Sequence, residues 1–210
     1  MNGIQLVCFD LGRVLIRICD SWAKACEAAG VLMPAAIEPA TYERILEVGR
    51  HHGTGAIDTR QFVEETARIT GLTPEQVAAV SAAWLRGPYP GVFELIERLT
   101  ATGVQTACLT NTNDRHWRQM TTPGDPNFLP LNRLTYRFAS HMIGHAKPSA
   151  ASYQHVEQTS GVAGASILFF DDEPDNVAAA QQRNWTACRI ELTDDTVAQM
   201  TQHLSNYGIL

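Results

Sequence analysis

At 210 residues, with 45% apolar and 18% charged side chains, the chain is long enough to bury a core as one domain with an insertion or as two small domains. Its net charge of -6 leaves no basic face that could follow a nucleic-acid backbone, so no nucleic-acid partner is expected. No apolar run is long enough to cross a membrane and the first residues lack the charged head and cleavage site of a secretory signal, which predicts a cytoplasmic protein without membrane contact.

The first half of the chain combines one buried strand with a block of helices. An apolar run over residues 4–9 predicts the strand, which ends at Asp10. From about residue 19 to residue 88 the pattern is helical, with no convincing strand. Four helices are predicted there: from Asp20 or Ser21 to Gly30, from Thr41 to His52, from Asp58 to Gly71, and from Thr73 onward. Helices inserted directly after a strand that ends in a carboxylate indicate a lid.

From residue 90 onward, predicted strands and helices alternate, which is typical of a parallel sheet covered on both faces. The predicted fold is therefore α/β, with a Rossmann-like core over residues 1–17 and 89–210 and an inserted helical cap over residues 18–88. Strands are predicted over residues 104–109, 136–139, 166–170 and 186–190, and helices over residues 92–99, around 116, over 149–161 and 177–183, and from about 194. In such sheets ligands bind beyond the C-terminal ends of the strands.

Three carboxylates stand at predicted strand ends. Asp171 and Asp172 directly follow the apolar run that ends at Phe170, as Asp10 follows the first run. Two adjacent acids at a buried strand end repel each other and resist desolvation, so they need a hard divalent cation unless the strand end lies in open water. If the two strands are parallel neighbours, the three carboxylates meet at one edge of the sheet.

Four segments resemble, in order and spacing, the four motifs of the haloacid dehalogenase-like superfamily. They are residues 9–15, 109–111, 147–148 and 170–172 with Asn176. Further details, in residues 110–113 with His116 and in residues 153–156, are most similar to its small sugar phosphatases of the α-D-glucose-1-phosphate phosphatase type. The resemblance covers essentially the whole predicted core, whereas over the helical insertion it extends only to position, helix count and a weak match at residues 55–57.

The resemblance implies a Mg²⁺-dependent phosphatase that hydrolyses a small phosphorylated metabolite, with a sugar phosphate expected. Asp10 would attack phosphorus and form an aspartyl-phosphate. Asp172 would bind Mg²⁺ together with Asp10 and the backbone carbonyl of Gly12, and Asp171 would act at the metal directly or through a water molecule.

The remaining motif residues would hold the phosphoryl group. The Thr110 hydroxyl and the Asn111 backbone would donate hydrogen bonds to it, and Lys147 would neutralise its oxygens. Asn176 would orient Lys147 or the metal site, and His116 lies near enough in the sequence to contact substrate. Of the adjacent histidines at positions 51 and 52 in the predicted lid, at most one can point inward.

One residue departs from the family pattern. In most phosphatases of this superfamily the second residue after the nucleophile is an aspartate that serves as general acid and base, and here it is Gly12. A proton for the leaving group must then come from water, from the lid or from a nearby side chain. General-acid assistance matters most for poor leaving groups, so Gly12 favours a sugar-1-phosphate-like or acyl-phosphate-like substrate over an alkyl phosphate.

Two other functions stay open at this point. A 2-haloacid dehalogenase would use the Asp10 carboxylate to displace halide without a metal, although the Asp171–Asp172 pair would then place needless charge beside the nucleophile. Alternatively, the loss of the acid at Gly12 would leave a protein that binds a phosphoryl group or a partner without turnover.

Overall fold

The structure is a computed structural model that describes residues 3–32, 38–192 and 195–210. Its core is a five-stranded parallel sheet with the strand order β5-β4-β1-β6-β7. β1 lies in the middle of this sheet, so both of its edges are paired. The strands are β1 (Leu6–Phe9), β4 (Gln105–Thr110), β5 (Tyr136–Ala139), β6 (Ile167–Asp171) and β7 (Thr186–Arg189).

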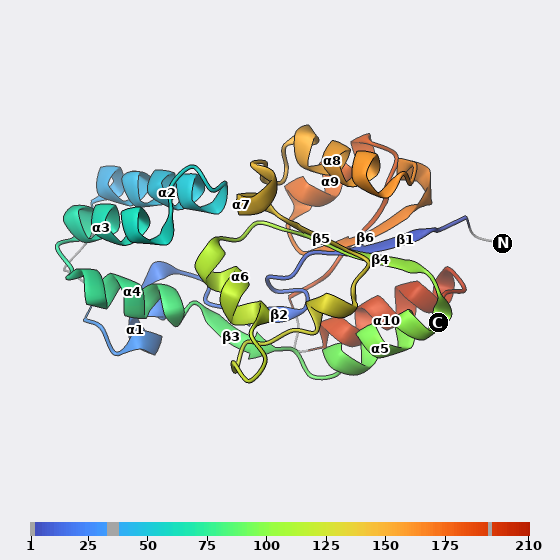
Figure 1. The fold of residues 1–210 in the computed structure, drawn as a ribbon, viewed down its shortest axis with the longest axis horizontal. Coiled ribbons are helices and arrows are strands. Elements are labelled where there is room, and N and C mark those ends of the chain that lie inside the picture. Colours follow the sequence, from blue (N-terminus) through green and yellow to red (C-terminus); the bar gives the residue numbers. More distant parts are fainter. Residues whose placement is uncertain (1–2, 33–37, 193–194) are drawn as a thin grey trace.

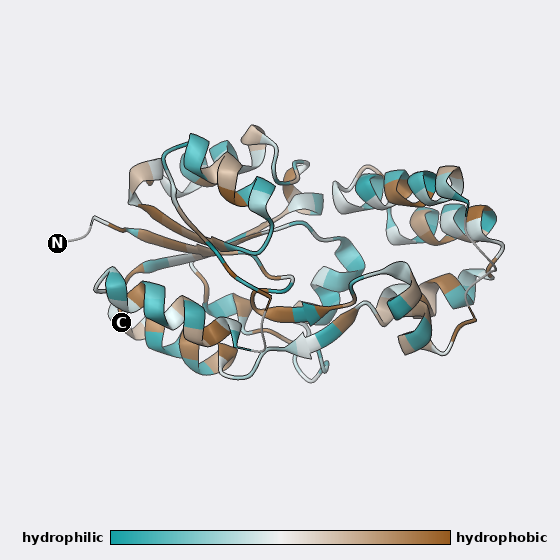
Figure 2. Cartoon of the chain, turned by 180° about the vertical axis from the view of Figure 1, so that it is seen from behind, coloured by the Kyte–Doolittle hydropathy of each residue, from teal (hydrophilic) through white to brown (hydrophobic). Residues whose placement is uncertain are grey.

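Helices cover both faces of the sheet: α5 and α10 lie on one face, and α8 and α9 on the other (Figure 1). Alternate residues of β1 accordingly enter different apolar clusters, Val7 and Phe9 on one face and Leu6 and Cys8 on the other. Apolar residues run along the strands between the helices in Figure 2. This is the Rossmann-like α/β core that the sequence predicts. Its covering helices are α5 (Val92–Thr102), α8 (Ala150–Ser160), α9 (Pro174–Gln182) and α10 (Thr196–Asn206).

The helices expected between residues 19 and 88 form a second group with a hydrophobic cluster of its own. Gln61 and Gln76 complete capping boxes with Asp58 and Thr73, which explains why two of these helices start where they do. The group lies beyond the C-terminal ends of the strands, at the opposite end of the molecule from the N-terminus (Figure 1). These inserted helices are α1 (Trp22–Ala29), α2 (Pro39–Gly53), α3 (Thr59–Thr70) and α4 (Pro74–Ala82).

The expectation of no strand between about residue 19 and residue 88 is wrong. β3 (Leu85–Pro88) pairs antiparallel with β2 (Ile16–Ile18), and this ribbon carries the chain out to the inserted helices and back. β3 contains a glycine and a proline, which are both rare in strands, so its pattern gives no local signal. The pairing depends instead on β2, which lies about 70 positions earlier in the sequence, as the hydrogen bond from Arg17 to the Gly87 carbonyl also shows.

Two short helices, α6 (Asp114–Thr121) and α7 (Ser140–Ile143), lie between the sheet and the inserted helices (Figure 1). Single 3-10 turns occupy Leu131–Arg133 and Gly164–Ser166. The last helix, expected from about residue 194, begins at Thr196, and residue 194 itself lies outside the described residues. Within the described ranges, no helix has the length and apolar content to span a bilayer.

Candidate active site

Asp10, Asp171 and Asp172 lie together at the C-terminal edge of the sheet. They meet there because β1 and β6 are parallel neighbours in register, with Phe9 opposite Phe170. One carboxylate oxygen from each residue lies within 4.8 Å of the others, and all three side chains are buried. The spacing suits a hard cation that takes oxygen ligands.

Lys147 is the buried counter-charge of this cluster. Its Nζ atom lies 2.9 Å from Asp10 Oδ1 and 2.6 Å from Asp171 Oδ2. Burial alone would lower the pKa of Lys147, but the two carboxylates outweigh it and hold the pKa above its usual value. The lysine is therefore charged at neutral pH. We call Asp10, Asp171, Asp172 and Lys147 the carboxylate site.

The carboxylate site carries more negative charge than Lys147 can balance. Burial, reinforced by Asp171, raises the pKa of Asp10 to about 7 although Lys147 opposes the shift. Burial together with Asp171 and Glu173 raises the pKa of Asp172 as well. Asp10 Oδ1 is buried and accepts no well-directed hydrogen bond from the residues that the structure describes, despite the nearby ammonium group. A divalent cation would supply both the missing charge and the missing partner.

Two asparagines hold the charged residues in place. Asn111, directly after β4, binds the Lys147 backbone twice: its Oδ1 accepts from Lys147 N and its Nδ2 donates to Lys147 O, both at 2.8 Å. Asn176, in the first turn of α9, donates from Nδ2 to Asp171 Oδ1 and Oδ2 at 3.0 and 3.1 Å. The Tyr153 hydroxyl in turn donates to the Asn176 carbonyl at 2.9 Å. The structure thus places Asn176 against the Asp171 carboxylate, which fits the expected orienting role better than a direct substrate contact.

Arg13 is a charged neighbour that the sequence analysis missed. Its guanidinium lies 3.1 Å from Glu173 Oε1 and 3.5 Å from Asp172 Oδ2, and it partly offsets the rise in the pKa of Asp172. The residue has a φ of 59°, in the left-handed region that non-glycine residues rarely adopt. A cation three residues after Asp10, in the same loop, was the signal that could have drawn attention to it.

Thr110 and Gly12 complete the edge. Thr110 is the last residue of β4, the strand beside β1, and is buried. Gly12 lies in the loop after β1, and its φ is outside the left-handed region. A Cβ atom added at Gly12 would meet its nearest neighbour, Ile18 Cδ1, at 3.4 Å, which is ordinary van der Waals contact. The backbone at this position therefore has room for a Cβ atom.

The sequence model of the haloacid dehalogenase-like hydrolases matches residues 4–182. The chain belongs to this family. A HAD family enzyme from Bacteroides thetaiotaomicron has a similar solved structure, with a TM-score of 0.79, 22% identity, and coverage of 94% of this chain and 98% of that one. For a HAD-like family hydrolase from Porphyromonas gingivalis the TM-score is 0.78, with 24% identity over 96% of this chain and 98% of that one. Phosphatase MT3486 of Mycobacterium tuberculosis (strain CDC 1551 / Oshkosh) is 35% identical over 72 residues, which is 34% of this chain and only 33% of that relative.

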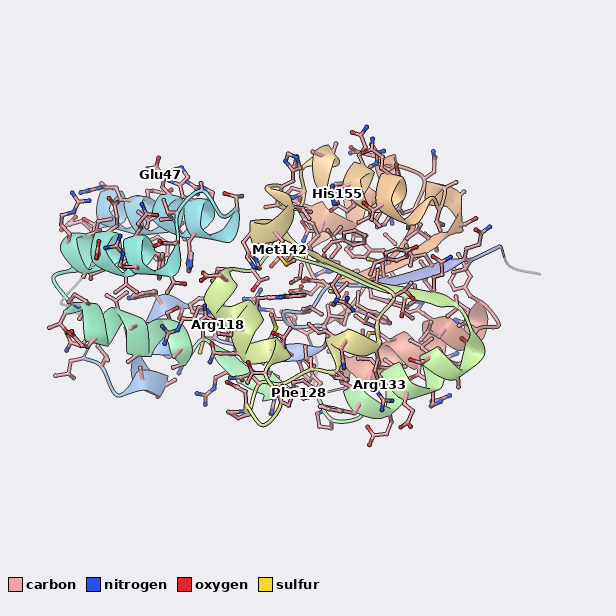
Figure 3. The ribbon with its side chains drawn as sticks, viewed as in Figure 1. Glu47, Arg118, Phe128, Arg133, Met142 and His155 are labelled. Carbon is pink, nitrogen blue, oxygen red and sulfur yellow. The ribbon has the colours of Figure 1, made fainter. Side chains whose placement is uncertain are left out.

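In this HAD-like hydrolase, α6 joins the inserted helices to the core. Asp114 Oδ1 accepts hydrogen bonds from the Thr59 hydroxyl at 2.5 Å and from His52 Nε2 at 2.9 Å. His52 is the buried member of the adjacent histidine pair, and His51 is exposed. Arg118, labelled in Figure 3, lies on the same helix, 3.6 Å from Asp114 Oδ2. An aspartate at a helix start usually stabilises that helix, so the position of Asp114 in the sequence does not predict this contact.

His116 makes a second contact from α6 to the inserted helices. Its Nε2 donates to the Ser81 carbonyl at 2.8 Å, and its Nδ1 accepts from Asn113 Nδ2 at 3.2 Å. Burial lowers the pKa of His116 to about 4, so the ring is neutral at pH 7. Both ring nitrogens are therefore used within the protein, and a substrate contact by His116 stays a prediction.

The inserted helices of the hydrolase also contact α7. The Ser140 hydroxyl donates to the Gly53 carbonyl at the end of α2. Gly55 has a φ of 73°, and a Cβ atom there would lie 2.4 Å from the His141 carbonyl oxygen. The weak sequence match at residues 55–57 thus marks a close approach of two backbones, where only glycine fits.

Proposed function

We propose that this HAD-like hydrolase is a Mg²⁺-dependent phosphatase that acts on a small phosphorylated molecule through an aspartyl-phosphate on Asp10. The proposal depends mainly on one observation, the buried Asp10 carboxylate between two further carboxylates and a charged lysine. The related Bacteroides enzyme has been solved as a magnesium complex and with magnesium and inorganic phosphate together. We further propose that residues 18–88 form a cap domain over this site.

The oxygen atoms of the site fit Mg²⁺, and we propose that Asp10, Asp172 and the Gly12 carbonyl would hold the ion. Asp171 already accepts hydrogen bonds from Lys147, from Asn176 and from the Glu173 backbone N–H, so we assign its metal contact to a bridging water. When bound, Mg²⁺ supplies positive charge that stabilises the oxygens of the phosphoryl group during transfer.

The chain's own residues perform the two displacement steps. An ionised Asp10 oxygen attacks phosphorus, the bond from phosphorus to the leaving oxygen breaks, and the leaving group takes a proton from water. A water molecule then attacks the aspartyl-phosphate, which releases inorganic phosphate and restores Asp10. Lys147 balances the charge of the phosphoryl oxygens, while the Thr110 hydroxyl and the Asn111 N–H donate hydrogen bonds to them.

The missing general acid at Gly12 limits the substrates of this proposal to those with weakly basic leaving oxygens. Sugar 1-phosphates, acyl phosphates and aryl phosphates meet this condition, and simple alkyl phosphates do not. The preference for a weakly basic leaving oxygen can be measured by comparing turnover of glucose 1-phosphate, which has an anomeric leaving oxygen, with that of glucose 6-phosphate, which is an alkyl phosphate. Faster turnover of the 6-phosphate would contradict the role that we give to Gly12.

Phosphate release from acetyl phosphate and phenyl phosphate tests the function itself. We expect release that needs Mg²⁺, stops with EDTA, and is abolished in Asp10→Asn. Glu47→Gln, a matched loss of one exposed carboxylate on α2, should behave as wild type (Figure 3). Silence on both substrates would support a binding protein instead, and EDTA-resistant release of chloride from 2-chloropropionate would support a dehalogenase.

A further inference from the structure

A cavity of about 470 Å³ lies between the inserted helices and the loop that follows β4. We call it the cap cavity. Asn111 lines it and also binds the Lys147 backbone, and Ala146, the residue before Lys147, lines it as well. The cavity therefore opens beside the carboxylate site, where the leaving group of a phosphorylated substrate would project. A larger hollow of about 600 Å³ borders the outer strand β5, and neither Asn111 nor Ala146 lines it.

The walls of the cap cavity are mainly apolar and aromatic. The inserted helices and the turn before β3 supply these side chains: Trp22, Ile45, Leu46, Phe62 and Trp84. Among the described residues that line it, Arg50 carries the one permanent charge and none is acidic. Leu46 is 39% exposed although it is apolar, which marks the cavity wall as a surface that a ligand could cover.

Most polar side chains of the cap cavity already have partners within the protein. The side chains that form hydrogen bonds within the protein are those of His52, Thr54, Asn111, Asn113, His116 and Ser140. A sugar would bury several hydroxyl groups here, and each one left without a partner costs about 1–3 kcal/mol. This lining therefore suits a ring with few polar atoms.

Trp22 supplies one hydrogen-bond donor that the protein leaves unused. Its side chain is nine-tenths buried, it lines the cap cavity, and Nε1 has no partner among the described residues. A buried indole N–H normally finds an acceptor. A ligand with a single acceptor on a planar apolar body would satisfy it.

We propose that the cap cavity binds the aromatic leaving group of an aryl phosphate, with Trp22 donating to an acceptor on the ring substituent. This inference rests on the proposed phosphatase function. Two independent observations support it, because a phenolate departs without the general acid that Gly12 lacks, and the cavity lining matches an arene. The phosphoryl group passes to Asp10 and the phenolate oxygen takes its proton from water.

Two cavity variants and a matched control test the inference. Leu46→Asn places a polar group in the apolar wall and should lower kcat/KM for phenyl phosphate about fivefold relative to acetyl phosphate, which has no ring; fivefold corresponds to about 1 kcal/mol. Leu192→Asn makes the same change at a 60% exposed position away from the cavity and should leave that ratio unchanged. Because Leu46 is partly exposed, both variants should fold, and the thermal midpoint checks this.

Trp22→Phe keeps an aromatic wall and removes only the donor. The wild-type preference for 4-acetylphenyl phosphate over 4-ethylphenyl phosphate should fall about fivefold in this variant, since the intrinsic leaving-group difference cancels between the two proteins. Unchanged ratios in both cavity variants, or a higher kcat/KM for glucose 1-phosphate than for phenyl phosphate, would overturn the inference while the phosphatase function stands. Failure to hydrolyse acetyl phosphate as well as phenyl phosphate would instead overturn the proposed function, and this inference with it.

Discussion

The carboxylate site and the cap cavity adjoin each other at Asn111 but differ in composition. The carboxylate site is a set of buried charges at the ends of strands in a rigid sheet. The cap cavity is a mainly apolar space whose walls come mostly from separate helices docked through hydrogen bonds on α6. The comparison suggests that the sheet provides the chemistry and the inserted helices select the substrate, so changes in each region should have separable effects.

The largest expected effect comes from removing the buried counter-charge. Lys147→Met should lower kcat about 10³-fold, because the phosphoryl oxygens lose their cation. It should also lower the free energy of unfolding without Mg²⁺ by about 3–5 kcal/mol, because Asp10 and Asp171 are left buried and unpaired. Urea unfolding with and without Mg²⁺ measures the second effect. Wild-type stability in the variant would contradict the charge balance described for the site.

Restoring the missing acid should change the chemical step at the carboxylate site for substrates with poor leaving groups. Gly12→Asp should raise kcat for an alkyl phosphate such as glycerol phosphate about 10²-fold and change that for phenyl phosphate little, since only the poor leaving group needs a proton. Gly12→Ala adds the same Cβ atom without the acid and is the matched control. Equal gains on both substrates would show that Gly12 does not limit leaving-group protonation.

Loosening the contact on α6 should affect substrate binding more than the chemical step. Asp114→Ala removes the acceptor of Thr59 and His52 and should lower the free energy of unfolding by about 2 kcal/mol. KM for phenyl phosphate should rise, because the walls of the cap cavity lose their anchor. Arg118→Ala removes only an exposed ion pair of the same Asp114 and should cost about 0.5 kcal/mol or less. A loss of kcat without any change in KM would contradict the proposed division.

The smallest effect should appear as a pH dependence of stability. Burial lowers the pKa of His116 to about 4, so the folded state binds this proton less tightly than the unfolded chain does. The contribution of the neutral His116 ring to the free energy of unfolding is fully present above pH 6.5 and is lost as the pH falls toward 4. Between pH 6.5 and pH 5, wild type should lose about 1.5 kcal/mol more than His116→Gln. Thermal unfolding at several pH values measures this difference. If the stabilities of the two proteins change equally between pH 6.5 and pH 5, the histidine is not held neutral.

The two regions also differ in how far the sequence predicts them. Apolar runs that end in Asp10 and in Asp171 are local signals, and a parallel sheet brings such strand ends together. The meeting of these carboxylates at the C-terminal edge of the sheet could therefore be predicted from the sequence pattern alone. The pairing of Arg13 with Glu173 joins residues 160 positions apart, and that of His52 with Asp114 joins residues 62 positions apart. No local pattern encodes such contacts. The sequence indicated that only one of the adjacent histidines could point inward, but which one depended on how α2 packs.

The same limit explains the error in the fold. β3 forms only because β2 lies beside it, and neither strand has a strong pattern of its own. The helices of the insertion were easier to place because their capping boxes involve residues three apart. Patterns within one helical turn could be recognised in the sequence, whereas contacts between residues far apart in the sequence could not.

Mapping the phosphorylated residue during turnover tests the central claim most directly. The enzyme would be mixed with Mg²⁺ and phenyl phosphate, quenched in acid after a few milliseconds, digested, and examined by mass spectrometry. We predict a phosphoryl group on the peptide that contains Asp10, and none in Asp10→Asn. Phosphate release that continues without any label on Asp10, or a label on a different residue, would contradict the account.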